Sequence, residues 1–235
     1  MRPIVLVHGA WGGAWIWKDV AARLRSEGFE VYAPTLSGVG ARSHIPAEVV
    51  ELDTHIEDVA ALMRFERLEG VLLVGHSYGG LVITGAADRE IARIGAMVYL
   101  DAFLPANGQS LWDVLGPEGA ERQRQAAEAN DGGRTLPYHL ARPGEVPPPD
   151  RPYTSQPIAT FNRPWVSVRP EQTWPHRRYI RCLQTTGPVF RRIAAELQGA
   201  PGWSLETFEA AHDVPLTHPR LVAATLADLA RRLDE

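Results

Sequence analysis

The sequence predicts an α/β fold, in which a mostly parallel sheet carries helices on both faces. Short apolar runs bounded by Gly, Pro or polar residues alternate along the chain with amphipathic stretches, which is typical of such a sheet. The length of 235 residues and the hydrophobic fraction of 45% suit one sizeable core. Cys182 is the single cysteine, which excludes an internal disulfide and any cluster of cysteine metal ligands.

Each predicted element follows from its own stretch of sequence. Three stretches have apolar residues at helical spacing and are expected to be helices: 17–26, which Gly28 stops, 54–67, and 220–233. The short apolar runs are expected to be the strands: 4–7, 30–33, 71–74, 96–100, 178–183 and 204–208.

The segment 107–175 breaks this alternation. Ten of the nineteen prolines fall between Pro137 and Pro175, which excludes central strands and long helices beyond the first part of the segment, 118–130. Its aromatic residues argue against plain disorder. We therefore predict a cap at 107–175 over a core formed by 1–106 and 176–235; a long, partly ordered surface loop is the alternative.

Charge and hydropathy limit the partners. Twenty-eight acidic and twenty-four basic residues give a net charge of -4, so no overall basic field is present to hold nucleic acid. No apolar run approaches the ~18 residues of a membrane span, and the run 4–7 is too short for the core of a signal peptide. We expect a cytoplasmic protein that acts on a small molecule, and the sequence leaves a homodimer open.

A glycine-rich turn follows the predicted strand 71–74. It reads G-H-S-Y-G from Gly75, which matches the G-x-S-x-G pattern, and a helix-compatible run follows at 81–87. In this context a sharp turn raises the serine hydroxyl clear of the sheet, and the two glycines let neighbouring backbone approach. We predict Ser77 as a nucleophile; the alternative is a glycine-rich turn with an incidental serine.

A second glycine-rich turn ends the first predicted strand and reads H-G-A-W-G-G from His8. Acyl transfer needs two backbone N–H groups aimed at the developing oxyanion, one from the residue after the nucleophile and one from a neighbouring loop. We expect the N–H groups of Tyr78 and Ala10 to form this oxyanion hole.

With these two turns the sequence resembles the α/β-hydrolase superfamily. It is most similar to the branch that contains plant methyl-ester hydrolases of the salicylate-binding type, hydroxynitrile lyases and bacterial carboxylesterases of the pyrethroid-hydrolase type. The matching stretches are L-V-H-G-A-W-G-G-A-W-I-W-K, T-L-S-G-V-G-A-R, V-G-H-S-Y-G-G and Y-L-D-A-F-L-P. The resemblance implies an α/β-hydrolase fold with a cap insertion, and it implies that His8 and His76 shape the pocket rather than act as bases.

A serine nucleophile needs a base, and His212 is the best candidate. It follows the predicted strand 204–208, near the C-terminus, as the chain order of this fold requires. The resemblance implies a proline seven positions after the catalytic histidine, and Pro219 stands there. The remaining histidines are expected to be solvated or packing residues: His44, His55, His139, His176 and His218. Of these, His139 and His176 could still touch substrate from the cap.

The acid is where the sequence departs from the resemblance. The methylesterase and lyase branch implies an aspartate shortly after the strand 179–183, but the stretch R-C-L-Q-T-T there is followed by no carboxylate before Glu196. Asp101 ends the preceding predicted strand, and a carboxylate at that position can reach the same imidazole. We predict Asp101 as the triad acid; the alternatives are Asp213, Glu209 or no acid.

These residues predict a serine hydrolase that cleaves carboxylic esters through an acyl-enzyme and needs no metal or organic cofactor. The aromatic cap favours small, mostly apolar substrates. The aromatic side chains expected to contact them are Trp11, Phe103, Trp112, Phe161 and Trp165.

Other functions stay open on the same residues. A lactonase, or a biosynthetic tailoring hydrolase or thioesterase, would use the same triad, and a small-molecule binding protein would use the same fold. Lyase chemistry is disfavoured, because the resemblance implies a lysine directly after the catalytic histidine, where Asp213 stands; Lys18 is the only lysine.

Overall fold

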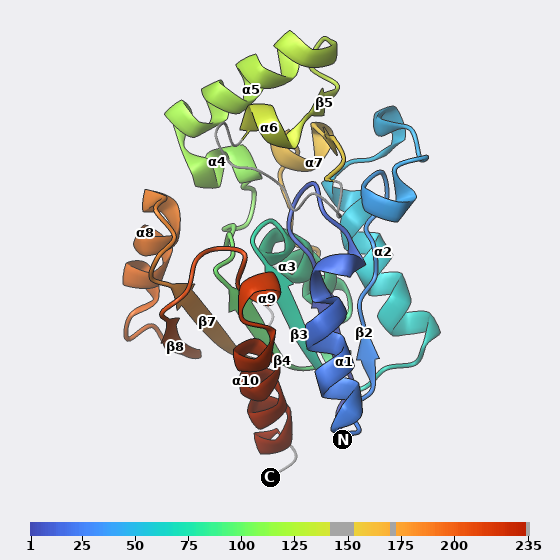
Figure 1. The fold of residues 1–235 in the computed structure, drawn as a ribbon, viewed down its shortest axis with the longest axis vertical. Coiled ribbons are helices and arrows are strands. Elements are labelled where there is room, and N and C mark those ends of the chain that lie inside the picture. The colour runs from blue at the N-terminus through green and yellow to red at the C-terminus, as the bar shows by residue number, and fades with distance from the viewer. Residues whose placement is uncertain (142–152, 170–172, 234–235) are drawn as a thin grey trace.

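A computed structural model describes residues 1–141, 153–169 and 173–233, and a six-stranded sheet runs through its centre (Figure 1). The strand order is β2-β1-β3-β4-β7-β8, and every neighbouring pair is parallel. The strands are β1 Ile4–Val7, β2 Val31–Tyr32, β3 Val71–His76, β4 Ile94–Leu100, β7 His176–Cys182 and β8 Trp203–Phe208.

All six predicted strands are confirmed, β1 with its predicted bounds and the other five with shifted ends. The strand expected at 30–33 keeps only two residues, because only Val31 and Tyr32 pair with β1. The strand expected at 178–183 begins at His176, because its first residues pair with β4.

Helices cover both faces of the sheet, which confirms the predicted fold class. One apolar cluster packs α1 (Lys18–Ser26) and α10 (Pro219–Arg232) against one face. The other cluster packs α2 (Leu52–Phe65), α3 (Gly79–Arg89) and α8 (Pro188–Leu197) against the opposite face. The short helices of the core are η1 Ala14–Trp17, η2 Gly40–Arg42, η3 Ala47–Val49, η4 Ile91–Arg93 and α9 Val214–Thr217.

The segment between β4 and β7 forms the small elements that lie together at the top of the view in Figure 1. They are α4 Leu111–Leu115, α5 Pro117–Asp131, β5 Thr135–Leu136, α6 Tyr138–Ala141, β6 Gln156–Pro157 and α7 Ala159–Asn162. The helix expected at 118–130 is α5, with Pro117 in its first turn and Gly132 in the left-handed conformation after its end. The boundaries 107 and 175 stay a prediction, and 142–152 and 170–172 lie outside the described residues.

The sheet topology already suggests where a ligand would bind. The chain passes from β1 outward to β2 and then returns to β3 on the other side of β1, so β1 and β3 form the point where the strand order reverses. In open α/β sheets, ligands bind at the carboxyl ends of the strands beside such a point. Both glycine-rich turns of the sequence lie there.

Within the described residues, no helix is long and apolar enough to cross a bilayer.

Candidate active site

The turn between β3 and α3 is too tight for side chains at its glycines. A Cβ atom on Gly75 would lie 2.6 Å from the carbonyl oxygen of Gly79, and one on Gly79 would lie 2.7 Å from that of Val7. Ser77, between the glycines, adopts a φ of 55°, which few non-glycine residues adopt. The turn therefore holds Ser77 in a strained conformation at the carboxyl end of β3, as the G-x-S-x-G pattern predicts.

Ser77, His212 and Asp101 lie in contact. His212, in the loop between β8 and α9, has its Nε2 atom 2.9 Å from Ser77 Oγ. Its Nδ1 atom is 2.8 Å from Asp101 Oδ2, and Asp101 follows the end of β4. With Nδ1–H donating to the carboxylate, Nε2 is available to accept the serine proton.

Asp101 is completely buried and has a full set of donors. Oδ1 accepts from Arg181 Nη1 at 2.9 Å and from the backbone N–H of Cys182 at 3.0 Å. Oδ2 also accepts from Thr185 Oγ1 at 2.6 Å. Burial by itself would raise the pKa of Asp101, but the hydrogen bonds from His212, Thr185 and Cys182 outweigh it and lower that pKa, so the group is a carboxylate.

The sequence reasoning missed Arg181 and Thr185. Both lie in the R-C-L-Q-T-T stretch, where the resemblance implied an acid, and the structure shows donors to a carboxylate on the neighbouring strand instead. The available signal was an arginine between Ile180 and Cys182 in a predicted strand, because a buried guanidinium requires an acceptor. In the described residues, the His212 ring hydrogen-bonds to Ser77 and Asp101, and neither Asp213 nor Glu209 hydrogen-bonds to it.

Two rings pack against the His212 imidazole. Its centroid lies 4.7 Å from that of His76 and 5.1 Å from that of Phe190, a residue of α8 that the sequence reasoning did not select. His76 Nε2–H donates to the His212 carbonyl at 2.9 Å. Burial, with a smaller effect from His212, lowers the pKa of His76 to about 4, so His76 is neutral near pH 7. It positions the His212 loop through this hydrogen bond and does not take part in the hydrogen bond between Ser77 Oγ and His212.

The two predicted oxyanion donors lie beside Ser77. A Cβ atom on Gly9 would lie 3.0 Å from Ser77 Cβ, so the turn that carries Ala10 packs directly against the serine. Within the described part of the chain, neither the Ala10 N–H nor the Tyr78 N–H donates to another group. Two unused N–H groups next to a serine hydroxyl are suited to an oxyanion.

A cavity of about 460 Å³ opens over Ser77, and Ala10, Tyr78 and His212 also line it. Of the five aromatic residues expected to contact substrate, Trp11, Phe103 and Phe161 line it. Its other lining residues come mostly from α4, α5, α6 and the loop before α8: Leu111, Leu115, Gly119, Arg122, Gln123, Leu140, Ala141, Thr185, Thr186, Gly187 and Phe190. The sequence does not single out any of these residues, because only tertiary packing brings them to Ser77.

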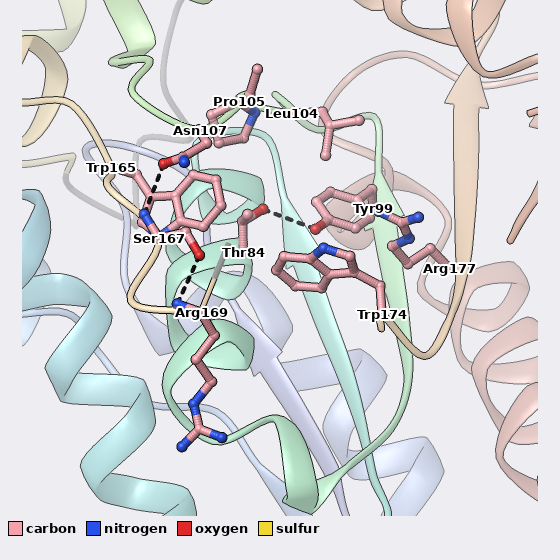
Figure 2. Close-up of a pocket in the computed structure, with 11 residues that line it drawn as sticks. Thr84, Tyr99, Leu104, Pro105, Asn107, Trp165, Ser167, Arg169, Trp174 and Arg177 are labelled. Atoms are coloured by element: carbon pink, nitrogen blue, oxygen red, sulfur yellow. Dashed lines mark hydrogen bonds between the residues drawn. The ribbon is translucent and has the colours of Figure 1, made fainter. Parts of the chain in front are cut away.

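Trp112 and Trp165 are placed elsewhere. Trp112 does not line the Ser77 cavity, although its indole N–H donates at 3.0 Å to Oε1 of Gln123, which does line it. Trp165 lines a separate cavity of about 220 Å³, together with Tyr99 and Trp174 (Figure 2). The Arg177 guanidinium lies 5.6 Å from the Trp174 ring and 4.4 Å from the Trp203 ring, so aromatic faces already stabilise this cation.

The remaining histidines are away from the Ser77 hydroxyl. His176 belongs to β7 rather than the cap and hydrogen-bonds to Ser204 Oγ at 3.0 Å. His139, His44 and His218 do not line the Ser77 cavity. His55 is buried: its Nε2–H donates to the Ser37 carbonyl at 2.6 Å, and its Nδ1 accepts from the Tyr78 hydroxyl at 2.9 Å.

A parallel α/β sheet with a serine on a strained strand-to-helix turn, a histidine and a buried carboxylate defines the serine-hydrolase class of α/β proteins. The comparisons agree. The family model described as "Alpha/beta hydrolase family" matches residues 4–225. A carbendazim-hydrolysing esterase from Nocardioides sp. (strain SG-4G) is 38% identical over 97% of this chain and 100% of its own length.

Two solved structures are similar over almost the whole chain. One is an extracellular α/β-hydrolase from a Paenibacillus species, described as homologous to tobacco salicylic acid binding protein 2, with a TM-score of 0.84, 24% identity and coverage of 97% and 98% of the two chains. The other is a pyrethroid hydrolase from Sphingobium faniae JZ-2, with a TM-score of 0.76, 26% identity and coverage of 98% and 97%.

The chain therefore belongs to the alpha/beta hydrolase family, and its relatives place it among the carboxylic ester hydrolases of that family. The resemblance drawn from the sequence motifs is confirmed.

Proposed function

We propose that the chain hydrolyses carboxylic esters with Ser77 as nucleophile, His212 as general base and acid, and Asp101 as the group that orients His212. One observation carries this proposal: the continuous hydrogen-bonded series from Ser77 Oγ through the His212 ring to Asp101, with distances of 2.9 and 2.8 Å. These distances lie within the reach that proton transfer requires.

The proposed reaction begins when His212 Nε2 takes the Ser77 proton as Oγ attacks the ester carbonyl carbon. The carbonyl oxygen becomes an oxyanion, which the N–H groups of Ala10 and Tyr78 bind. His212 then gives the proton to the leaving alcohol, and Ser77 keeps the acyl group. Water, deprotonated by His212, attacks the acyl carbon, and the acid product leaves with Ser77 restored.

Asp101 keeps its negative charge throughout this sequence. Its lowered pKa favours the carboxylate, which accepts the His212 Nδ1–H and stabilises the positive charge that develops on the ring. Arg181 holds the other carboxylate oxygen, Oδ1, and Thr185 donates to the same Oδ2 as His212. The proposed acid is therefore fixed by β7, although it follows β4.

The walls of the cavity favour a small, mostly apolar ester. Trp11, Phe103, Phe161 and Phe190 surround Ser77, and a volume of about 460 Å³ lies within the usual range for small-molecule sites. Carbendazim, named for the Nocardioides relative, is one compound to assay. We further propose, from the sequence alone, that the protein acts in the cytoplasm.

Hydrolysis of p-nitrophenyl esters, from acetate to octanoate, tests the proposal in wild type and Ser77→Ala. We expect wild-type turnover that favours short chains, and a fall on the order of 10⁶-fold in the variant, the effect of losing the nucleophile of a triad. A fluorophosphonate should label wild type and leave Ser77→Ala unlabelled. Wild type without turnover or labelling would show a binding protein. Labelling without turnover on these esters would favour a lactonase or a thioesterase.

A further inference from the structure

The cap binds all three polar groups of Trp11, the residue after Ala10. The Trp11 backbone N–H donates to Gln156 Oε1 at 2.9 Å. Its carbonyl accepts from the backbone N–H of Thr154 at 2.9 Å, and its indole N–H donates to the Leu136 carbonyl at 2.7 Å. These partners follow Trp11 by more than a hundred residues, so the turn after β1 is held by the cap.

The Gln156 side chain is itself fixed. It is 1% exposed, and its Nε2 donates to Thr160 Oγ1 at 2.8 Å. The Thr160 hydroxyl in turn donates to the Pro157 carbonyl at 2.6 Å. These bonds leave Gln156 Oε1 as the acceptor that faces Trp11. Gln156 is also the β6 partner of Leu136 in β5, so both strands of the small cap sheet bind Trp11.

Trp11 needs such support because of its backbone conformation. Its φ is 62°, in the left-handed region, where a bulky residue is a genuine outlier. Such a conformation costs on the order of 1–3 kcal/mol and persists only where its surroundings enforce it. The Trp11 N–H and the Ala10 carbonyl belong to one peptide plane, so the bond to Gln156 orients that plane. The Ala10 N–H belongs to the preceding Gly9–Ala10 peptide, and holding the plane after Ala10 limits how that N–H can turn.

We propose that Gln156 is a positioning residue for ester hydrolysis: it holds the Ala10–Trp11 peptide so that the Ala10 N–H points at the oxyanion. The inference rests on the proposed function. Gln156 does not touch the substrate, and it acts only through the turn. Its loss affects the transition state, where the oxyanion is formed, more than the bound ester, whose carbonyl carries less charge.

The test compares Gln156→Met with Gln109→Met. Methionine keeps the length of the side chain and removes the acceptor. Gln109 is a matched control, because it is also a cap glutamine whose Oε1 accepts a backbone N–H, that of Ala106 at 2.8 Å, and it does not line the Ser77 cavity. The readouts are kcat, KM, Tm and the inhibition constant of an alkyl trifluoromethyl ketone, which forms a tetrahedral adduct on the serine.

For Gln156→Met we expect kcat to fall about 10- to 100-fold, below the ~10²- to 10³-fold cost of deleting an oxyanion donor outright. KM should stay within about twofold, because ground-state binding is unchanged. The ketone should bind more weakly by the same factor as kcat falls. Gln109→Met should keep the wild-type kcat and ketone affinity.

Thr160→Val provides a second variant in case Gln156→Met does not fold. It removes the hydroxyl that holds the Gln156 amide, and kcat and ketone affinity should again fall together, by a smaller factor. Folded variants with wild-type kcat and ketone affinity would overturn the proposal, as would a change in KM alone. Wild type that neither hydrolyses esters nor reacts with a fluorophosphonate would instead overturn the proposed function.

Discussion

The two turns that meet at Ser77 are held by different parts of the chain. The turn after β3 is bonded to the core: the Ser77 N–H donates to the Leu100 carbonyl at 3.3 Å, and the Ser77 carbonyl accepts from the Phe103 N–H at 3.0 Å. The turn after β1 is bonded to the cap through Trp11. The backbone of the nucleophile is therefore held by core segments, whereas one proposed oxyanion donor precedes a residue that is held by the segment 107–175.

Each turn also has a buried histidine behind it. His8 donates from Nδ1 to the Gly9 carbonyl at 2.7 Å and accepts the Leu36 N–H on Nε2. His55 holds the Tyr78 hydroxyl. Burial is the main cause that lowers the pKa of both histidines to about 4, so both are neutral near pH 7. Buried neutral imidazoles therefore brace both turns from the core. The segment 107–175 touches Tyr78 through the side chains of Thr160 and Phe161, but in the described residues it hydrogen-bonds to the backbone of only one of the two turns, the turn after β1.

The largest expected effect is the loss of turnover when Asp101, a residue of the core, is replaced. Asp101→Asn should lower kcat by about 10⁴-fold, because an amide cannot keep His212 in the useful tautomer. Steady-state hydrolysis of the best p-nitrophenyl ester measures this loss, and it should exceed that of Gln156→Met by a factor of at least about 100.

Asp213→Asn is the control for that prediction. Asp213 follows His212 in sequence but does not hydrogen-bond to its ring, so its variant should keep wild-type turnover. If Asp101→Asn stays active and Asp213→Asn does not, the assignment of Asp101 is wrong and Asp213 is the triad acid.

The next effect concerns the contact between the two turns. A Cβ atom on Gly79 would lie 2.7 Å from the Val7 carbonyl oxygen and 2.9 Å from that of His8. Gly79→Ala should therefore push β1 and its turn away from β3 and cost about 4 kcal/mol of unfolding free energy, near the upper end for a single substitution.

Urea unfolding measures this cost. Gly187→Ala is the stability control, because a Cβ atom there meets nothing within 4 Å and the φ of Gly187 is -71°. Equal stability of the two variants would mean that the turns are not packed as closely as the structure has them.

The smallest effect is a pH dependence of stability. His8 and His55 have pKa values lowered from 6.5 to about 4 in the folded state, so below pH 6.5 the unfolded chain binds protons that the native protein does not. Their stabilisation is fully present above pH 6.5 and is lost as the pH falls to about 4. At ~1.4 kcal/mol per unit, each histidine accounts for on the order of 3 kcal/mol.

Urea unfolding at a series of pH values between 7 and 4 measures the slope, and His55→Gln should flatten it, whereas His44→Gln, at an exposed position, should not. An unchanged slope in His55→Gln would mean that folding does not lower the pKa of His55, which contradicts a buried, neutral ring that accepts from the Tyr78 hydroxyl. That result would remove the brace inferred for the turn after β3.

The sequence by itself determined the fold class, the six strands and the three residues that meet at the site. Apolar runs and helical spacing act over a few residues, and Ser77, His212 and Asp101 each directly follow, or closely follow, a recognisable strand. Because the carboxyl ends of parallel strands share one edge of the sheet, their order in the chain was enough to predict a meeting.

Only the tertiary structure decided what surrounds these residues. Arg181 on Asp101, Gln156 on Trp11, Phe190 on His212 and the position of Trp165 away from Ser77 all depend on contacts between segments far apart in the chain. A local pattern shows that a side chain is apolar or polar, but its partner is chosen by how distant segments of the chain pack together. That packing comes from the summed burial and hydrogen bonding of many residues, so no short stretch of sequence determines it.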